Sequence, residues 1–202
     1  MLSVNSRKTM LRAENLNIYC AGFPLLENLS FDLKSGQGLQ ICGPNGIGKT
    51  LFIKALIGLH PFYSGTKTFA PDQDFHYVGV EMPFDGNFSL YDNFLYLGHI
   101  QQVSLEFEKM SALFGITDFI HQKFKELSWG QKQRANLSLL FLKPAPLWIL
   151  DEPFQHLDTQ YKKVLENILT QHMAQGGAVL VAEHDMSLGL PQLHLQHFLA
   201  AA

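Results

Sequence analysis

The chain has 202 residues, of which 47% are hydrophobic, and its 15 basic and 18 acidic side chains give a formal net charge of −3. This length predicts one domain, residues 1–202, with a substantial core, and the scattered charges lack the basic surface of nucleic-acid-binding proteins, so we expect no nucleic-acid partner. The two cysteines have neither zinc-site nor disulfide-framework spacing, and no apolar run is long enough for a membrane span, which predicts a chain of a reducing compartment that does not itself cross the membrane.

In chain order, apolar or alternating runs alternate with segments of helical spacing. The predicted strands are 12–18, 25–33, 39–42, 74–80, 147–151 and 178–182. A predicted helix begins at Gly48, helical periodicity covers 90–126, and further helices cover 129–142 and 159–175, with Asp158 or Thr159 as the last helix's N-cap. This alternation predicts an α/β fold with a mostly parallel sheet, a helical insert at about 84–142, and a ligand site at the carboxyl ends of the strands.

The strongest local pattern lies between the strand at 39–42 and the helix that follows it. It matches GxxxxGK[ST] and consists of Gly43, Pro44, Asn45, Gly46, Ile47, Gly48, Lys49 and Thr50. Glycines let backbone N–H groups converge on phosphate oxygens, Lys49 supplies a cation, and the Thr50 hydroxyl can bind Mg²⁺. The pattern predicts a phosphate-binding loop; a chance glycine-rich turn is the alternative.

Two carboxylates, Asp151 and Glu152, follow the apolar strand at 147–151. At the carboxyl end of a parallel strand they would lie near the phosphate loop. We expect Asp151 to hold the hydration shell of Mg²⁺ and Glu152 to polarise the water that attacks the γ-phosphate. Taken alone, such a pair is more typical of a helix cap or a solvated turn.

The segment Leu127–Arg134, LSWGQKQR, resembles the signature of the ATP-binding cassette family. Its Ser128 and the Gly130 amide stand at a predicted helix start, which favours an anion, although an ordinary serine cap gives the same pattern. Further family landmarks occur in order: Tyr19 for stacking on adenine, Glu81, Asp158 and His184. The resemblance implies a P-loop ATPase with N-terminal antiparallel strands, in which ATP and Mg²⁺ lie between the phosphate loop of one subunit and the signature, with Gln131, of a second copy.

In that resemblance His184 contacts the γ-phosphate and the attacking water, and Glu81 stands where a glutamine joins Mg²⁺ and water. Leu51 replaces a hydroxyl residue, so only its backbone N–H is expected to reach the α-phosphate. Trp129 and His156 also depart from the usual small residues. The remaining histidines lack such support; His194 and His197 have one-turn helical spacing, but a metal or haem site there is the less favoured interpretation.

Within the family, pieces such as QICGPNG and DEPF are similar to the ATP-binding subunits of cytochrome c maturation exporters. This resemblance implies a separate transmembrane partner, a homodimer that forms on ATP binding, work on haem or another factor in cytochrome c assembly, and a peripheral position on the cytoplasmic face of the inner (plasma) membrane. Three alternatives remain open: an exporter ATPase for another small cargo, a soluble cassette protein of translation or DNA repair, and a regulator that binds nucleotide without hydrolysis.

Residues 84–114 are more aromatic and apolar than one helix face requires. The side chains concerned are Phe84, Phe88, Tyr91, Phe94, Leu95 and Tyr96. They are expected either to pack the insert against the sheet or, where exposed, to form the coupling surface for the membrane partner.

Overall fold

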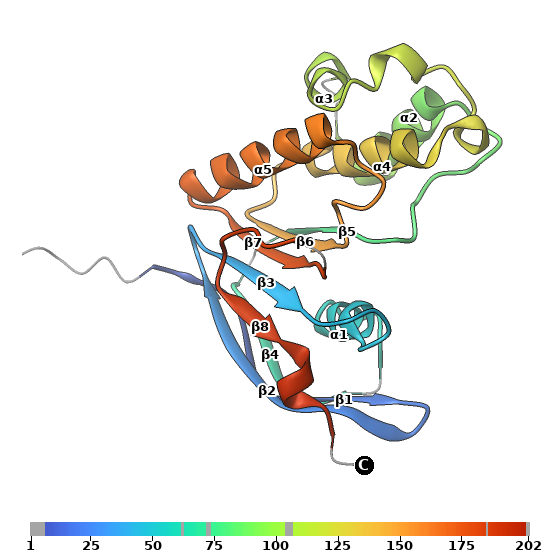
Figure 1. The fold of residues 1–202 in the computed structure, drawn as a ribbon. Coiled ribbons are helices and arrows are strands. Elements are labelled where there is room, and N and C mark those ends of the chain that lie inside the picture. Colours follow the sequence, from blue (N-terminus) through green and yellow to red (C-terminus); the bar gives the residue numbers. More distant parts are fainter. Residues whose placement is uncertain (1–6, 62, 72–73, 104–106, 185, 201–202) are drawn as a thin grey trace, which may run out of the picture.

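The computed structural model describes residues 7–61, 63–71, 74–103, 107–184 and 186–200. Its strands form two sheets (Figure 1). A three-stranded antiparallel sheet has the order β2-β1-β4, and a five-stranded parallel sheet has the order β5-β6-β7-β3-β8. The strands are β1 (Thr9–Cys20), β2 (Phe23–Lys34), β3 (Gly38–Cys42), β4 (Tyr63–Phe69), β5 (Phe75–Val78), β6 (Leu147–Asp151), β7 (Ala178–Ala182) and β8 (Gln192–His194).

The parallel sheet is the centre of the molecule because both of its faces are buried. Successive side chains of a strand point to opposite faces, so Ile149 packs with the core around helix α1 (Lys49–Leu56) and the antiparallel sheet. Its neighbours Trp148 and Leu150 pack with the core on the helical side. Every residue of β6 and β7 is buried, which explains why these strands are continuous apolar runs.

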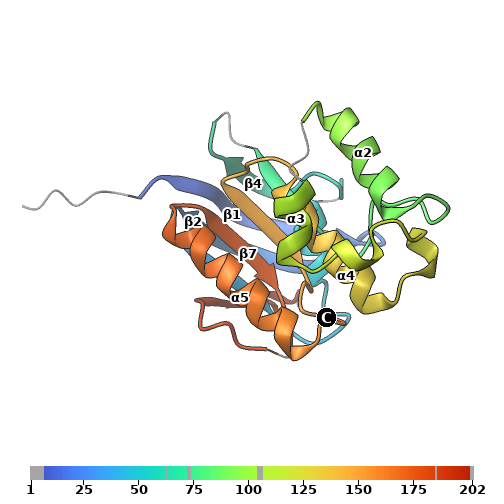
Figure 2. The ribbon, with the colours of Figure 1, turned by 90° about the horizontal axis from the view of Figure 1, so that it is seen from above.

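The helical side carries α2 (Leu90–Gln101), α3 (Phe107–Leu113), α4 (Trp129–Ser138) and α5 (Thr159–Ala174), which Figures 1 and 2 show on the face of the parallel sheet opposite α1. The periodic stretch 90–126 is therefore helical, as predicted, but divided into α2, α3 and short 3-10 turns. Ser89 begins α2 by accepting the N–H of Asp92 at 3.1 Å. The predicted helix 129–142 is shorter, since a 3-10 turn at Leu139–Phe141 replaces its last turn.

Two strands have no counterpart in the sequence prediction. Strand β4 pairs with β1 at the sheet edge, where most of its side chains are exposed or half-buried, so it lacks an apolar signal. A Cβ on Gly65 would lie 2.2 Å from the Asn15 carbonyl oxygen, so only glycine allows this pairing. Strand β8 has three residues and ends at His194, whose ring lies 5.6 Å from that of His197. No cluster of three metal-ligating side chains occurs among the described residues.

The helices within the described ranges are all too short or too polar to cross a membrane.

Asp158 caps α5 as predicted, since its side chain accepts the Tyr161 N–H at 2.9 Å.

Candidate nucleotide site

The phosphate loop, residues 43–50, runs from the carboxyl end of β3 into the first turn of α1. Gly48 has φ 109° and precedes the helix directly, a left-handed conformation that favours glycine. A Cβ on Gly48 would meet Leu25 at 2.8 Å, and one on Gly43 would meet Ile47 at 2.9 Å. The glycines therefore let the loop close tightly over the helix start, where free N–H groups favour phosphate.

Lys49 is almost fully buried, yet its ammonium group has three oxygen neighbours. Its Nζ donates to the carbonyl oxygens of Gly43 at 2.9 Å and Pro44 at 3.4 Å, and it lies 3.4 Å from Glu152 Oε1. A buried ammonium needs such neighbours because its charge is costly away from water. The structure thus brings the predicted cation of the loop directly to one of the predicted acids.

Asp151 ends β6, and the residue is only 2% exposed. Neither oxygen meets hydrogen-bond geometry with a described residue, although the Thr50 hydroxyl lies close enough to lower its pKa. Burial is the largest influence and raises the pKa of Asp151, and the adjacent Glu152 charge acts in the same direction. A buried carboxylate beside a hydroxyl has the oxygen chemistry of a Mg²⁺ site, so Asp151 and Thr50 fit that ion.

Glu152 is held on several sides at the same sheet edge. Its backbone has φ 50°, a conformation rare for a non-glycine residue, and its N–H donates to Ala182 at 2.9 Å. Its carboxylate contacts Lys49 and the side-chain amide of Gln155. His184 Nδ1 lies 3.8 Å from Oε1 of the same group. The structure therefore brings together three side chains that the sequence assigns to the reaction.

Glu183, which the sequence prediction does not include, is part of this cluster. Glu183 directly follows β7, just as Glu152 directly follows β6, and its side chain is buried. Its Oε1 accepts the backbone N–H of His184 at 2.8 Å and lies 3.4 Å from His184 Nδ1. The signal that identified Asp151 and Glu152, an acid at the carboxyl end of an apolar strand, would have identified Glu183.

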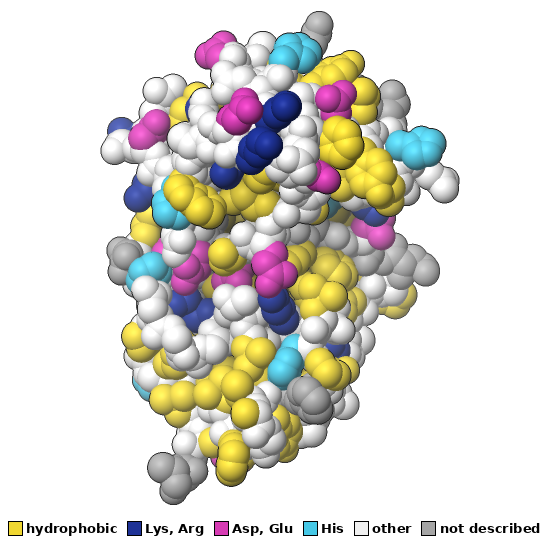
Figure 3. All heavy atoms as spheres, turned by 90° about the vertical axis from the view of Figure 1, so that its right-hand side faces the viewer, with side chains coloured by type: hydrophobic (Ala, Val, Ile, Leu, Met, Phe, Trp, Pro, Cys, Tyr) yellow, Lys and Arg dark blue, Asp and Glu magenta, His cyan; other side chains and the backbone are white. Residues whose placement is uncertain are grey.

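Glu81 lies at the edge of this region, with its side chain 85% exposed. Lys54 of α1 donates to it at 2.8 Å, and this hydrogen bond together with the lysine charge lowers the pKa of Glu81. Burial raises the pKa of Tyr77 to about 12, and the charges of Asp151 and Glu81 add to the rise. Figure 3, which views the molecule from the right-hand side of Figure 1, shows acidic and basic side chains next to one another across the middle of that face. The role of Glu81 toward Mg²⁺ and water stays a prediction.

The signature begins α4 with a capping box. Ser128 accepts the Gln131 N–H at 3.3 Å, and Gln131 Oε1 accepts the Ser128 N–H at 2.8 Å. A Cβ on Gly130 would lie 2.9 Å from the His156 carbonyl oxygen, so glycine allows the loop containing His156 to approach. Trp129 is 64% exposed, and its ring lies 5.6 Å from that of His156, which itself has φ 60°. The two unusual residues are thus neighbours.

Two buried amides join α4 to the loops of the site. Gln133 Nε2 donates to the Pro153 carbonyl at 2.9 Å, next to the acid pair. Asn136 Nδ2 donates to the Gly79 carbonyl at 2.9 Å, two residues before Glu81. Because both groups are buried, breaking either bond leaves a carbonyl without its partner, at a cost of about 1–3 kcal/mol. The signature helix is therefore fixed to both loops.

Tyr19 lies in β1, and Leu51 lies in the first turn of α1 directly after the phosphate loop. Tyr19 is half-buried in β1, with its hydroxyl 3.5 Å from Ser64 Oγ. Leu51 is half-buried against the core around α1. Adenine stacking by Tyr19 and the α-phosphate contact of the Leu51 N–H stay predictions.

The aromatic residues of the helical part divide into two groups. Phe94 is fully buried, Phe84 packs against it with ring centroids 5.5 Å apart, and Tyr91 stacks on Phe107 at 4.8 Å. These form core, as the alternative interpretation predicts. Phe88, Leu95 and Tyr96 are instead exposed, by 58%, 45% and 65%.

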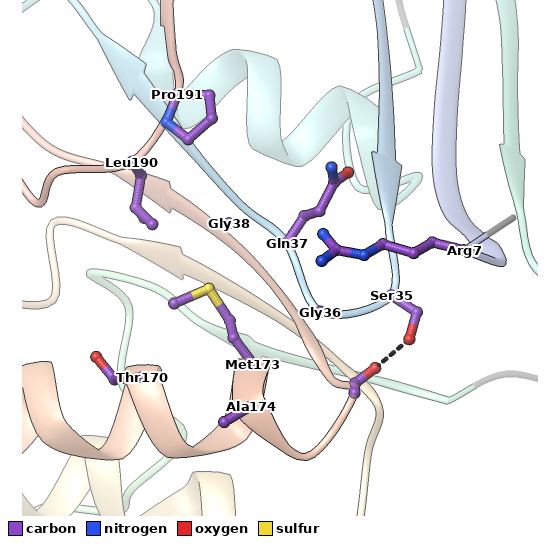
Figure 4. Close-up of a pocket in the computed structure, with 11 residues that line it drawn as sticks. Arg7, Ser35, Gly36, Gln37, Gly38, Thr170, Met173, Ala174, Leu190 and Pro191 are labelled. Carbon is purple, nitrogen blue, oxygen red and sulfur yellow. Dashed lines mark hydrogen bonds between the residues drawn. The ribbon is translucent and has the colours of Figure 1, made fainter. Parts of the chain in front are cut away.

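A cavity of about 670 Å³ lies away from this site (Figure 4). It is lined by residues before and at the amino end of β3, including Ser35 and Gly38, and by the end of α5. The phosphate loop follows the opposite end of β3. The described residues that line this cavity include none of the predicted site residues.

The chain is similar to known proteins in sequence and in fold. Residues 26–155 match the family model described as ABC transporter. The chain is 34% identical to the cytochrome c biogenesis ATP-binding export protein CcmA of Xylella fastidiosa, covering 95% of this chain and 96% of that protein. It is 33% identical to the protein of that name from Paramagnetospirillum magneticum, covering 94% and 95%. A solved structure, a putative ABC transporter ATP-binding protein from Pyrococcus furiosus, is 20% identical, has a TM-score of 0.81 and covers 95% of this chain and 100% of that chain, which supports the fold.

Proposed function

The chain belongs to the ABC transporter family of ATPases, and we propose that it is the ATP-hydrolysing subunit of an export complex that serves c-type cytochrome biogenesis. The cluster of Lys49, Glu152 and His184 at the carboxyl ends of the parallel strands carries the hydrolytic part of the proposal. The name shared by the near-full-length relatives supports the cytochrome part. We assign the complex to the handling or export of haem.

The side chains divide the work of phosphoryl transfer. Lys49 exchanges its carbonyl partners for the β- and γ-phosphates of ATP, to which it offers a buried positive charge. Thr50 and Asp151 would hold Mg²⁺, which neutralises phosphate charge when bound. Glu152 accepts the proton of the attacking water, and the neighbouring His184 contacts the γ-phosphate and that water.

The active form in this proposal is a homodimer, with each ATP between the phosphate loop of one copy and the signature of the other. Ser128 and the Gly130 amide lie at the amino end of α4, where the helix dipole favours a negative γ-phosphate. Asp158 stands at the start of α5 on the same loop as His156, which touches the signature. These positions support a composite site.

A transmembrane subunit is the partner that ABC ATPases of export systems act on, and we place its contact on α2. The exposed Phe88, Leu95 and Tyr96 supply apolar surface that a monomer has no need to expose. A short helix of the membrane subunit fits such a surface. The chain would then sit peripherally on the cytoplasmic face of the inner membrane.

The substitution Glu152→Gln tests the hydrolytic assignment, because it removes the base and preserves side-chain size. In the complex purified with its membrane partner, we expect ATP turnover to fall about 10²- to 10⁴-fold while ATP binding is retained. Glu14→Gln, an exposed site on β1, is the matched control and should hydrolyse at the wild-type rate. Wild-type turnover by Glu152→Gln would contradict the assignment.

The cytochrome assignment is tested separately in cells that lack the gene. Wild-type protein should restore haem-stained c-type cytochromes, and Glu152→Gln should not. If the deletion strain retains normal c-type cytochromes while the complex still hydrolyses ATP, the chain serves another cargo.

A further inference from the structure

Glu183 and His184 are consecutive, yet both reach the same cluster at the end of β7. The Glu183 N–H donates to Ile41 of β3 at 3.1 Å, which fixes the backbone where β7 ends. The neighbouring strand β6 is in register at this level, since Asp151 pairs with Ala182 and the Glu152 N–H donates to the Ala182 carbonyl. Two carboxylates from adjacent strand ends therefore flank one imidazole.

The charges around the His184 ring decide which nitrogen carries its proton. Nδ1 is buried and faces Glu183 Oε1 at 3.4 Å and Glu152 Oε1 at 3.8 Å. A neutral imidazole has one N–H donor and one lone-pair acceptor. A lone pair on Nδ1 would point at two negative oxygens, whereas an N–H there is attracted to both. Glu183 Oε1 is the closer of the two to Nδ1, and Glu152 is also engaged by Lys49 and Gln155.

We propose that Glu183 is the positioning residue for His184: its carboxylate keeps a proton on Nδ1 and so directs the Nε2 edge of the ring to the nucleotide. Because Nδ1 is buried, the 17% exposure of this side chain lies on its other atoms. In this proposal the ring edge that carries Nε2 is the one that faces the γ-phosphate. A carboxylate that orients a histidine through its second nitrogen is a recurring arrangement in catalytic sites. This inference rests on the proposed function for its consequence, although the tautomer itself does not.

The test is the tautomeric state of His184, measured on protein with ¹⁵N-labelled histidine by long-range ¹H–¹⁵N correlation at a pH where the ring is neutral. The spectrum of His184→Gln assigns the signal among the nine histidines. We expect the proton on Nδ1 in the wild type and in Glu152→Gln. Glu183→Met, of similar length but without an acceptor, should shift the population toward Nε2–H, and Glu183→Gln, which keeps an acceptor oxygen, should restore Nδ1–H.

The complex gives a second readout. Glu183→Met should lower kcat about tenfold or more with little change in the KM for ATP, and Glu183→Gln should recover part of the loss. A wild-type ring protonated on Nε2, or an unchanged tautomer in Glu183→Met, would overturn the proposal, and a shift in Glu152→Gln would give the role to Glu152. Failure of ATP hydrolysis in the wild-type complex would instead remove the proposed function and leave the tautomer result standing.

Discussion

The substitution Asp151→Asn separates the stability that is lost by burying the Asp151 charge from the proposed role of that charge in binding Mg²⁺. Asp151 is 2% exposed, and neither oxygen of its carboxylate meets hydrogen-bond geometry with a described residue. Without Mg²⁺, ionised Asp151 therefore destabilises the fold, and an amide of the same shape removes that charge. We expect Asp151→Asn to raise the free energy of unfolding of the metal-free protein by about 1–2 kcal/mol, the gain typical of replacing a destabilising residue that is kept for function. For a domain of this size that raises Tm by roughly 2–8 °C.

The effect has a defined pH dependence. Since the pKa of Asp151 is raised above its ordinary value of 3.8, stability from this group is fully present below that value and is lost as pH rises through the folded-state pKa. Asparagine does not titrate. The Tm advantage of Asp151→Asn should therefore be largest at neutral pH and disappear toward pH 3.8.

The assay is thermal unfolding with EDTA and with Mg²⁺ and ATP. Ligand at 100 times its Kd should stabilise the wild type by about 2.7 kcal/mol, and Asp151→Asn should lose most of the Mg²⁺-dependent part of this gain. Asp118→Asn, the same change at an exposed position, is the control and should alter neither value. A lower metal-free Tm for Asp151→Asn, or full Mg²⁺-dependent stabilisation, would refute the reasoning.

Three further predictions follow from the contacts of the site. Lys49→Ala should weaken ATP binding tenfold or more in a titration of the isolated chain, because a phosphate counter-charge is lost; unchanged affinity would contradict the role of Lys49. Gly130→Asp should lose ATP-driven dimerisation, measured by sedimentation in the Glu152→Gln background, because its carboxylate would face the γ-phosphate. Gly130→Ala is the control: its Cβ lies 2.9 Å from the His156 carbonyl oxygen and should destabilise the fold by about 1–3 kcal/mol, so only a larger loss of dimerisation in Gly130→Asp is due to the charge. Phe88→Ser and Tyr96→Ser should leave Tm and ATP binding unchanged but abolish co-purification with the membrane partner; retention of the partner by both would place the contact elsewhere.

The prediction about the coupling surface needed one correction. Sequence alone makes Tyr91 as good a surface residue as Phe88, because both belong to one aromatic run. In the structure Tyr91 stacks on Phe107, so Tyr91→Ser would disturb packing before it disturbed a partner. Tyr96, on the exposed side of α2, is therefore the residue to substitute together with Phe88.

The central strands were predictable because their burial on both faces demands apolar runs, and β6 and β7 occur at the predicted residues. The turn of residues 43–50 between β3 and α1 was predictable because its glycines satisfy a local backbone requirement, with positive φ at Gly43, Gly46 and Gly48. Strand β4 was not, since it pairs at an edge and much of its side-chain surface stays exposed. The pairing of Glu81 with Lys54 depends on where α1 lies in space, which no local pattern contains.

Helix α4 physically links the signature to the loop that follows the acid pair. Its first turn presents Ser128 and Gly130, and its next turns send Gln133 to Pro153 and Asn136 to Gly79. Both bonds are buried, so a displacement of α4 moves the carbonyls that they hold or breaks the bonds at a cost of about 1–3 kcal/mol each. Contact of the signature with a second copy would therefore be transmitted to the loop after Glu152 and to the loop before Glu81. Helix α2 follows the Glu81 loop in the chain and carries the exposed Leu95 and Tyr96, with Phe88 just before its start. Helix α4 and the Glu81 loop therefore connect the proposed composite ATP site to the surface proposed for the membrane partner.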